Sequence, residues 1–254
     1  MESPAKIPLS AFLPCQAEYI FDNSPLLIVE KCRQVGFTWA SAYRICRRVF
    51  SSEYPEDHFW ISRDEFTAKL FLQDVLMWLK VYEDVCNHGK QYKSPIIDWV
   101  NGVQAMKIEF ENGCNLYVLS SSVNAVVGKR GHFYMDEFAI HKDAEALYNI
   151  AEPCTTWGFT MTIFSTHRSK QTFFYKLCQR VKKGDIPGGR LMTVTLRDVL
   201  SEGYIDRINA KKILAGQELY TDPEDFYIEK SKKSSSEAMF LQEYMCIPAD
   251  ADAV

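Results

Sequence analysis

Residues 26–39 read LLIVEKCRQVGFTW and set the architecture of the chain. They open with four apolar residues, 26–29, directly after the turn sequence Asn23-Ser24-Pro25. A short apolar run bounded by a turn predicts a buried strand. From Trp39 onward, apolar residues recur every three or four positions with arginines between them, which predicts a helix beginning near Thr38. The stretch is therefore interpreted as a strand, an eight-residue loop and a helix.

The same alternation continues along the chain. Buried strands are predicted at residues 58–62, 132–135, 159–164 and 191–195, and helices at 64–85, 143–150 and 170–183, with helical segments to the end. Residues 105–110 and 114–119 alternate apolar and polar around Asn112-Gly113, which predicts a β-hairpin. Short buried strands alternating with helices predict an α/β fold, with a parallel sheet, helices on both faces and the hairpin as an insertion at one edge.

Length, composition and charge exclude several classes of protein. The chain has 254 residues, of which 47% are hydrophobic and 24% charged, which excludes disordered, collagen-like and disulfide-scaffold proteins. Its eight cysteines occur singly without metal-type spacing, so a reducing compartment is expected. The net charge of −4 argues against a protein that holds nucleic acid statically through many phosphate contacts. No long apolar run or signal pattern is present, and we expect no membrane partner.

The loop between the first strand and helix carries the chemistry of an anion site. A phosphate loop usually reads GxxxxGK[ST]. Its backbone N–H groups surround phosphate oxygens, its lysine neutralises their charge, and its hydroxyl binds Mg²⁺. Here Gly36 and Thr38 match, Phe37 occupies the lysine position, and Lys31 stands where the first glycine would be. Arg33 adds a second cation. The alternative is an ordinary strand-to-helix turn with surface cations.

Two acids follow another predicted strand. Asp136 and Glu137 come after the apolar run ending at Met135, and such a pair can hold Mg²⁺ and orient a water molecule. The alternative is a strand end capped by solvated acids. Ser165 and Thr166 follow the fourth strand, and the carboxyl ends of parallel strands meet at one edge of a sheet. We therefore expect the loop, the two acids and this Ser-Thr pair to converge.

These residues together resemble a known family, the ATPase half of the large terminase subunit of tailed bacteriophages, in its Mu-like branch. Residues 30–39 resemble its deviant phosphate loop, and residues 12–16, FLPCQ, are similar to the segment whose glutamine reads adenine. Arg130-Gly131 followed by residues 134–139, YMDEFA, resembles the second motif, and Ser165-Thr166 resembles the coupling motif. Residues 240–244 are similar to the stretch leading out of the ATPase core.

The resemblance implies a P-loop NTPase core of the ASCE/RecA-like type that binds ATP and Mg²⁺. It implies that Gln16 contacts adenine, that Glu137 polarises the attacking water, and that Thr38 and Asp136 hold Mg²⁺. Arg33 and Arg130 are candidates for a catalytic arginine, acting in their own subunit or in a neighbour. The remaining implied nucleotide contacts are Lys31, Cys32, Arg33, Gln34, Val35, Gly36, Phe37, Thr38, Ser165 and Thr166.

The function implied is an ATP-hydrolysing motor that moves double-stranded DNA into the procapsid without reading its sequence. The implied partners are DNA, the portal protein, the small terminase subunit and further copies in a ring, in the host cytoplasm. Two alternatives are a nucleotide-binding assembly module with little hydrolysis and another helicase-like, DNA-stimulated ATPase. Two lysine-rich clusters are candidates for DNA contact or for solvated helix ends: Lys176, Arg180, Lys182 and Lys183, and Lys230, Lys232 and Lys233.

The chain is expected to divide into an ATPase domain, residues 1–235, and a C-terminal helix and linker, residues 236–254. Large terminases resemble this chain only in their first half and continue into a nuclease domain, whereas this sequence stops at Val254. We therefore expect no nuclease activity from this chain.

Overall fold

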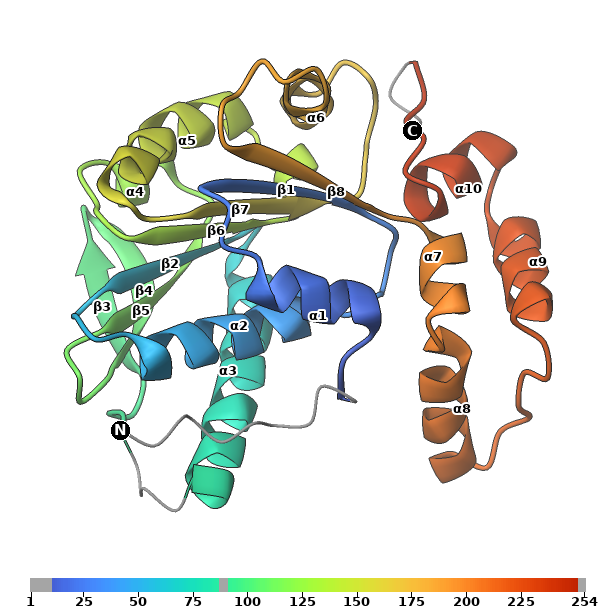
Figure 1. The fold of residues 1–254 in the computed structure, drawn as a ribbon, viewed down its shortest axis with the longest axis horizontal. Helices are drawn as coiled ribbons and strands as arrows, with labels where there is room; N and C mark the ends of the chain where they lie inside the picture. Colours follow the sequence, from blue (N-terminus) through green and yellow to red (C-terminus); the bar gives the residue numbers. More distant parts are fainter. Residues whose placement is uncertain (1–10, 87–90, 251–254) are drawn as a thin grey trace.

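The computed structural model describes residues 11–86 and 91–250 and is built around one eight-stranded sheet (Figure 1). The strand order is β3-β4-β5-β2-β6-β7-β1-β8. Six strands from β5 to β8 pair in parallel, whereas β3 and β4 pair antiparallel with their neighbours. The strands are β1 (Leu26–Lys31), β2 (Asp57–Ser62), β3 (Ile96–Val100), β4 (Val103–Glu109), β5 (Asn115–Ser120), β6 (His132–Asp136), β7 (Met161–Ser165) and β8 (Gly189–Val194).

Helices cover both faces of the sheet, as the sequence predicts (Figure 1). One face packs against α1 (Pro14–Phe21), α2 (Phe37–Ser51) and α3 (Glu65–Cys86). The other packs against α4 (Val123–Val126), α5 (Ala144–Ala151) and α6 (Phe173–Lys182), with short 3-10 turns at Phe138–Ile140 and Glu152–Trp157. Because the parallel strands are buried on both faces, they read in the sequence as continuous apolar runs.

Four helices lie beyond the β8 edge of the sheet, coloured orange to red in Figure 1. They are α7 (Leu196–Ser201), α8 (Tyr204–Leu214), α9 (Pro223–Lys233) and α10 (Glu237–Tyr244). Phe226 and Phe240 are buried in the same hydrophobic cluster as α1, α2 and α3. The predicted boundary at residue 235 stays a prediction, and the ends of the predicted domains, residues 1–10 and 251–254, lie outside the described residues.

The predicted elements are present, with bounds shifted by three residues or fewer. The hairpin is confirmed as β4 and β5 at one edge of the sheet, and it continues the sheet because β5 pairs with β2. Strand β3 is not among the predicted elements, and it joins β4 through Asn101-Gly102, both with left-handed φ. In the order β6-β7-β1, one strand lies between the phosphate-loop strand and the strand carrying the acids.

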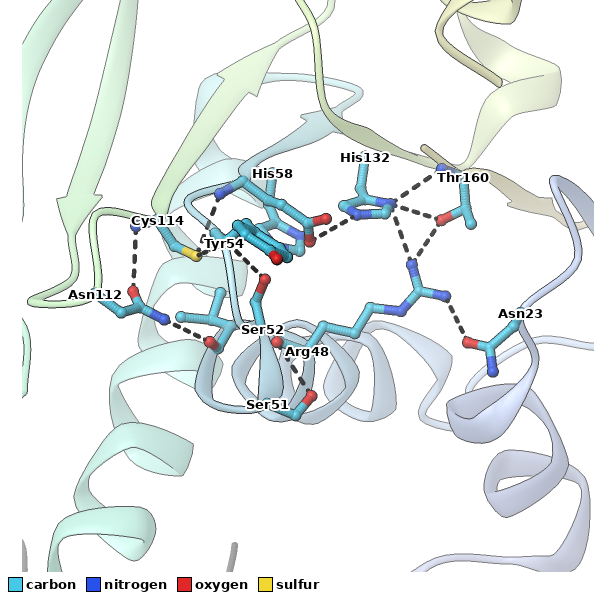
Figure 2. Close-up of polar contacts among 12 residues, drawn as sticks. Asn23, Arg48, Ser51, Ser52, Tyr54, His58, Asn112, Cys114, His132 and Thr160 are labelled. Atoms are coloured by element: carbon cyan, nitrogen blue, oxygen red, sulfur yellow. Dashed lines mark hydrogen bonds and ion pairs between the residues drawn. The ribbon is translucent and has the colours of Figure 1, made fainter. Parts of the chain in front are cut away.

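A polar network lies at the edge of the sheet where the parallel strands begin. Figure 2 shows Arg48 of α2 reaching toward His132 and Thr160, and its guanidinium donates to the Thr160 hydroxyl at 2.6 Å. The Thr160 N–H donates to Nδ1 of His132 at 3.0 Å, so that nitrogen is the acceptor and Nε2 carries the proton toward Glu56 at 3.2 Å. His132 therefore has a structural role.

Seven cysteines have described side chains, and all seven are buried and free: Cys15, Cys32, Cys46, Cys114, Cys154, Cys178 and Cys246. Within the described ranges no helix has the length and apolar character needed to cross a bilayer.

Candidate functional site

The loop from Cys32 to Gly36 leads into a cradle of unpaired backbone N–H groups, those of residues 34–38. Gln34 and Gly36 have left-handed backbones, with φ of 59° and 73°, which turns the chain tightly between β1 and α2. Across residues 11–86 and 91–250, we find no protein acceptor for the backbone N–H groups of residues 34–38. Because these groups lie at the start of a fifteen-residue helix, they form a favourable site for an anion.

Neighbouring elements hold the loop in this shape. The Gln16 amide of α1 donates to the carbonyl of Val35 at 2.7 Å, and the Tyr204 hydroxyl of α8 donates to the carbonyl of Gln34 at 2.8 Å. The Cys32 N–H donates to Val194 of β8 at 2.8 Å. A Cβ atom at Gly36 would lie 2.9 Å from the Gln16 amide nitrogen, so a side chain here would have to displace that amide as well as adopt a left-handed φ.

Gln16 is thus engaged in bracing the loop. Its carbonyl oxygen accepts from the Leu13 N–H at 2.9 Å, and the side chain is buried. One amide hydrogen and one oxygen lone pair remain for any further contact. Its predicted contact with adenine stays a prediction.

Phe37, in the usual lysine position, faces the core. Its side chain is 1% exposed and meets the Tyr19 ring edge-on, with centroids 5.1 Å apart. The hydrophobic position explains why the lysine is absent, because an ammonium here would be buried among aromatic rings. The positive charge of the loop is supplied from elsewhere.

Lys31 supplies that charge, and its ammonium group lies beside the predicted acids. The Lys31 ammonium lies 3.0 Å from Oε1 of Glu137, and the Thr38 hydroxyl donates to Oδ2 of Asp136 at 3.1 Å. The structure therefore brings together residues from β1, from the start of α2 and from the end of β6. The expected convergence of a cation-bearing loop with the acid pair is present in the fold.

The acids differ in their ionisation. Burial and the adjacent Glu137 raise the pKa of Asp136 to about 7. Burial also opposes ionisation of Glu137, but the charge and hydrogen bond of Lys31 outweigh it and hold the pKa of Glu137 below its usual range. Burial lowers the pKa of Lys31, yet Glu137 and Asp136 more than compensate and raise it. Glu137 is thus a carboxylate beside a cation, the form in which it can accept a proton.

The Asp136 carboxyl fits a divalent cation. Its Oδ1 is buried and has no hydrogen-bond partner in the described part of the chain, while Oδ2 faces the Thr38 hydroxyl. An unpaired buried carboxylate oxygen is costly unless a ligand completes its coordination, and Mg²⁺ prefers carboxylate, hydroxyl and water oxygens. The two predicted metal ligands, Thr38 and Asp136, are therefore adjacent, and both offer oxygen atoms that suit Mg²⁺.

Ser165 and Thr166, at the end of β7, lie beside the two acids. The Ser165 hydroxyl accepts from the Ala139 N–H at 3.1 Å, and the backbone of Thr166 helps to lower the pKa of the Glu137 carboxyl. His167 continues this contact toward β1, because its Nε2 lies 2.7 Å from Oε2 of Glu30. Glu137 itself has a left-handed φ of 50°, a strained conformation of the kind that occurs at functional sites.

The two arginines are placed differently. Arg33 lies on the loop and pairs with Glu243 of α10 through its side chain, while its backbone N–H donates to the Glu243 carbonyl at 3.0 Å. Arg130 precedes β6 and stacks over Trp157 at 5.5 Å, at the edge opposite the acids. The structure does not bring Arg130 to the site of its own chain, because the whole length of β6 separates it from Asp136.

The contacts that α8 and α10 make with the loop are not among the predicted ones. Tyr204 and Glu243 lie 170 and 210 residues from their partners on the loop, and neither stands in a recognisable local motif. The resemblance of residues 240–244 marked the α10 segment but assigned no role to its glutamate.

Comparisons with known proteins identify the family of the chain and its fold. A family described as "Terminase large subunit, T4likevirus-type, N-terminal" matches residues 28–254. The chain belongs to the terminase large subunit family. Similar curated proteins include the Mu-like prophage FluMu protein gp28 of Haemophilus influenzae, 28% identical over 95% of this chain and 47% of that protein. Another is the "Probable terminase, large subunit gp28" of Escherichia phage Mu, 24% identical over 93% of this chain and 43% of that protein.

Solved terminase structures share the fold. The large terminase ATPase domain of a Thermus phage superposes with a TM-score of 0.64 at 13% identity, covering 97% of this chain and 99% of that one. The large terminase of a thermophilic bacteriophage in complex with ADP superposes with a TM-score of 0.60 at 13% identity, covering 94% of this chain and 54% of that one. The terminase ATPase-domain fold is therefore present, and this chain spans less than half the length of the two curated relatives.

Proposed function

We propose that this terminase chain is an Mg²⁺-dependent ATPase that drives translocation of double-stranded DNA. The observation that carries the proposal is the meeting of Lys31, Thr38, Asp136 and Glu137 beside the unpaired N–H groups of residues 34–38. Phosphoryl transfer to water requires an anion cradle, a cation, two side chains that can hold Mg²⁺ and an ionised carboxylate.

Each residue has a distinct task in this proposal. The loop N–H groups and Lys31 bind the β- and γ-phosphates. Thr38 and Asp136 would hold Mg²⁺, which supplies charge neutralisation at phosphate oxygens. Glu137 orients water and takes its proton as the bond between the γ-phosphorus and the ADP oxygen breaks. Ser165 and Thr166 support Glu137, and Arg33, which lies on the loop, is the candidate catalytic arginine of its own chain.

The ion pair between Lys31 and Glu137 suits a resting site. While Lys31 binds Glu137, the carboxylate is neutralised and is a weak base. A triphosphate in the cradle offers the ammonium a stronger anionic partner, which frees Glu137 for water. Substrate binding and activation of the base are thereby linked through one lysine.

The partners and setting follow from family membership as further proposals. The curated relative of Haemophilus phage HP1 is described as "Probable terminase, ATPase subunit". We infer DNA contact without base recognition, assembly as a ring on the portal protein, interaction with the small terminase subunit, and action in the host cytoplasm. Arg130, remote from its own site, is available for a neighbouring copy in such a ring.

Turnover of Mg-ATP by the wild type, Glu137→Gln and Glu145→Gln tests the proposal. Glu145 is an exposed acid on α5 and serves as the control. We expect Glu137→Gln to lower kcat by about 10² or more, because general-base catalysis contributes about 10²–10⁴. ATP affinity, measured separately with a fluorescent analogue, should change by only a few-fold.

Two results would contradict hydrolysis at this site. Turnover that persists unchanged in Glu137→Gln would remove Glu137 as the base. Nucleotide binding without turnover in the wild type, measured with DNA and at concentrations that allow assembly, would favour the nucleotide-binding assembly module.

A further inference from the structure

A basic hollow lies beside the phosphate loop, between α9 and α10. It has a volume of about 220 Å³, and its polar lining is formed by Arg33, Lys230, Lys233, Ser234, Ser235 and Glu243. These side chains come from three places in the fold: the loop, the end of α9, and the turn and helix of α10. A solvated helix end would gather cations from one element only, whereas here a loop arginine faces helix lysines.

The charges of the lining leave an excess of positive charge. Three cations and one carboxylate line the hollow, which amounts to a net charge of +2. The carboxylate, Glu243, is 5% exposed and is already paired with Arg33, and a guanidinium nitrogen of Arg168 lies 3.9 Å from its other oxygen. Glu243 is therefore neutralised within the wall of the hollow and does not offset the lysines.

Several donors in the hollow remain available to a ligand. Only Nε of Arg33 has a protein acceptor among the described residues, and the side chain is 52% exposed, so both terminal nitrogens can donate. Lys230 lies over the Phe226 ring at 4.9 Å and has no carboxylate partner in the described part of the chain. Lys233 pairs with Glu229 at 2.6 Å but is 69% exposed, and such a pair is worth little.

We propose that this hollow is a binding site for a phosphate group, separate from the nucleotide cradle. A forked guanidinium with two ammonium groups and serine hydroxyls suits tetrahedral oxyanions, and the volume accommodates one phosphate. The phosphate can come from the DNA backbone or from free inorganic phosphate. Relevance to DNA rests on the proposed function, and Arg33 would connect an occupied hollow directly to the phosphate loop.

Binding to a double variant, Lys230→Gln with Lys233→Gln, tests the site without nucleotide. The control is Lys211→Gln with Lys212→Gln, which removes two lysines from the last turn of α8. One arm measures fluorescence anisotropy of a labelled mixed-sequence DNA duplex over a range of salt concentrations. The other measures inorganic phosphate binding by calorimetry at constant ionic strength. Circular dichroism verifies that both variants fold.

If the DNA backbone supplies the phosphate, the double variant should bind the duplex about tenfold more weakly, and the slope of log K against log salt should fall by about one, because the hollow holds one phosphate. The control should keep its slope. If free phosphate is the ligand, the double variant should lose phosphate binding while DNA binding is unchanged. Equal behaviour of the variant and the control in both arms, or no binding of either probe by the wild type, would overturn the site. Neither result depends on ATP turnover.

Discussion

Phe37 illustrates how one side chain changes the chemistry of a loop. It stands where a phosphate loop normally carries lysine, yet its ring packs against Tyr19 in the core. Lys31 supplies the charge from the other end of the loop, where it reaches Glu137. Charge can therefore move within the loop while the backbone cradle stays in place.

Restoring the usual lysine should damage the protein. Phe37→Lys places an ammonium at a position 1% exposed, so we expect the free energy of unfolding to fall by about 3 kcal/mol or more, with no gain in ATP affinity. Phe37→Leu, which keeps an apolar side chain, should cost about 1–2 kcal/mol. Urea denaturation measures both. A Phe37→Lys variant as stable as Phe37→Leu would show that this position does not need an apolar side chain.

His132 makes a pH-dependent contribution to stability. Burial and the nearby Arg48 lower its pKa to about 4, whereas an unfolded histidine titrates near pH 6.5. Between these values the unfolded chain binds the extra proton, so the contribution of His132 is fully present above pH 6.5 and is lost as the pH falls toward 4.

A comparison of wild type with His132→Asn isolates this effect. Asparagine keeps an acceptor for the Thr160 N–H but does not titrate. We expect the stability advantage of the wild type to shrink by about 2 kcal/mol between pH 7.5 and pH 5. Urea denaturation at both pH values gives the difference, and an advantage that stays constant would show that His132 titrates normally in the folded state.

Between α4 and β6, the junction depends on a glycine. Gly131 has φ of 154°, and a Cβ atom there would lie 2.1 Å from the Asp57 carbonyl oxygen of β2. Gly128, three residues earlier, also has a left-handed φ, 72°, but a Cβ atom would meet nothing within 4 Å. At both positions a side chain would strain the backbone, but only at Gly131 would it also collide with a neighbouring strand.

Alanine at these two positions separates the effects. Gly128→Ala should cost about 1 kcal/mol from backbone strain, whereas Gly131→Ala must also displace β2 from β6 and should cost about 3 kcal/mol or more. Thermal and urea unfolding measure the difference. Equal losses would mean that the β2–β6 contact is not tight at Gly131.

Strands and helices differ in how clearly the sequence marks them. The central strands and α2 are visible because burial imposes continuous apolar runs or a helical period. β3 is not, because Ile97 and Trp99 are exposed at the edge of the sheet and no buried face repeats along it. Its turn, Asn101-Gly102, was the available signal.

Across the whole molecule, Glu243 joins the α7–α10 region to the phosphate loop. Its carbonyl and carboxylate both bind Arg33, and the carboxylate is almost fully buried. Glu243→Gln keeps the shape of the side chain but removes its charge, which weakens the charge-assisted contact. The coupling between α10 and the loop should loosen while the sheet is unaffected.

Hydrogen exchange reports this coupling by region. In Glu243→Gln, the amides of α10, Cys32 and Arg33 should exchange about tenfold faster, whereas those of β1 and β7 should be unchanged. Glu237→Gln, an exposed acid on the same helix, is the control. Faster exchange in both variants, or in neither, would show that Glu243 does not link α10 to the loop.

Much of the candidate site follows from local sequence, because a parallel sheet collects the carboxyl ends of its strands on one edge. This rule predicts that the loop, Asp136 with Glu137, and Ser165 with Thr166 lie together, and they do. The tasks assigned to these residues stay predictions. Arg130 shows the limit of the rule, since a residue before a strand lies at the other edge.

Local patterns alone specify the strand-loop-helix unit, the parallel α/β class and the acids at a strand end, because burial and turn chemistry act over neighbouring residues. Tertiary structure decides which atoms meet. Lys31 reaches Glu137 across 106 residues, Phe37 turns into the core, and Arg33 pairs with Glu243 across 210 residues. These contacts depend on strand order and on how helices pack against the sheet, which result from interactions along the entire chain.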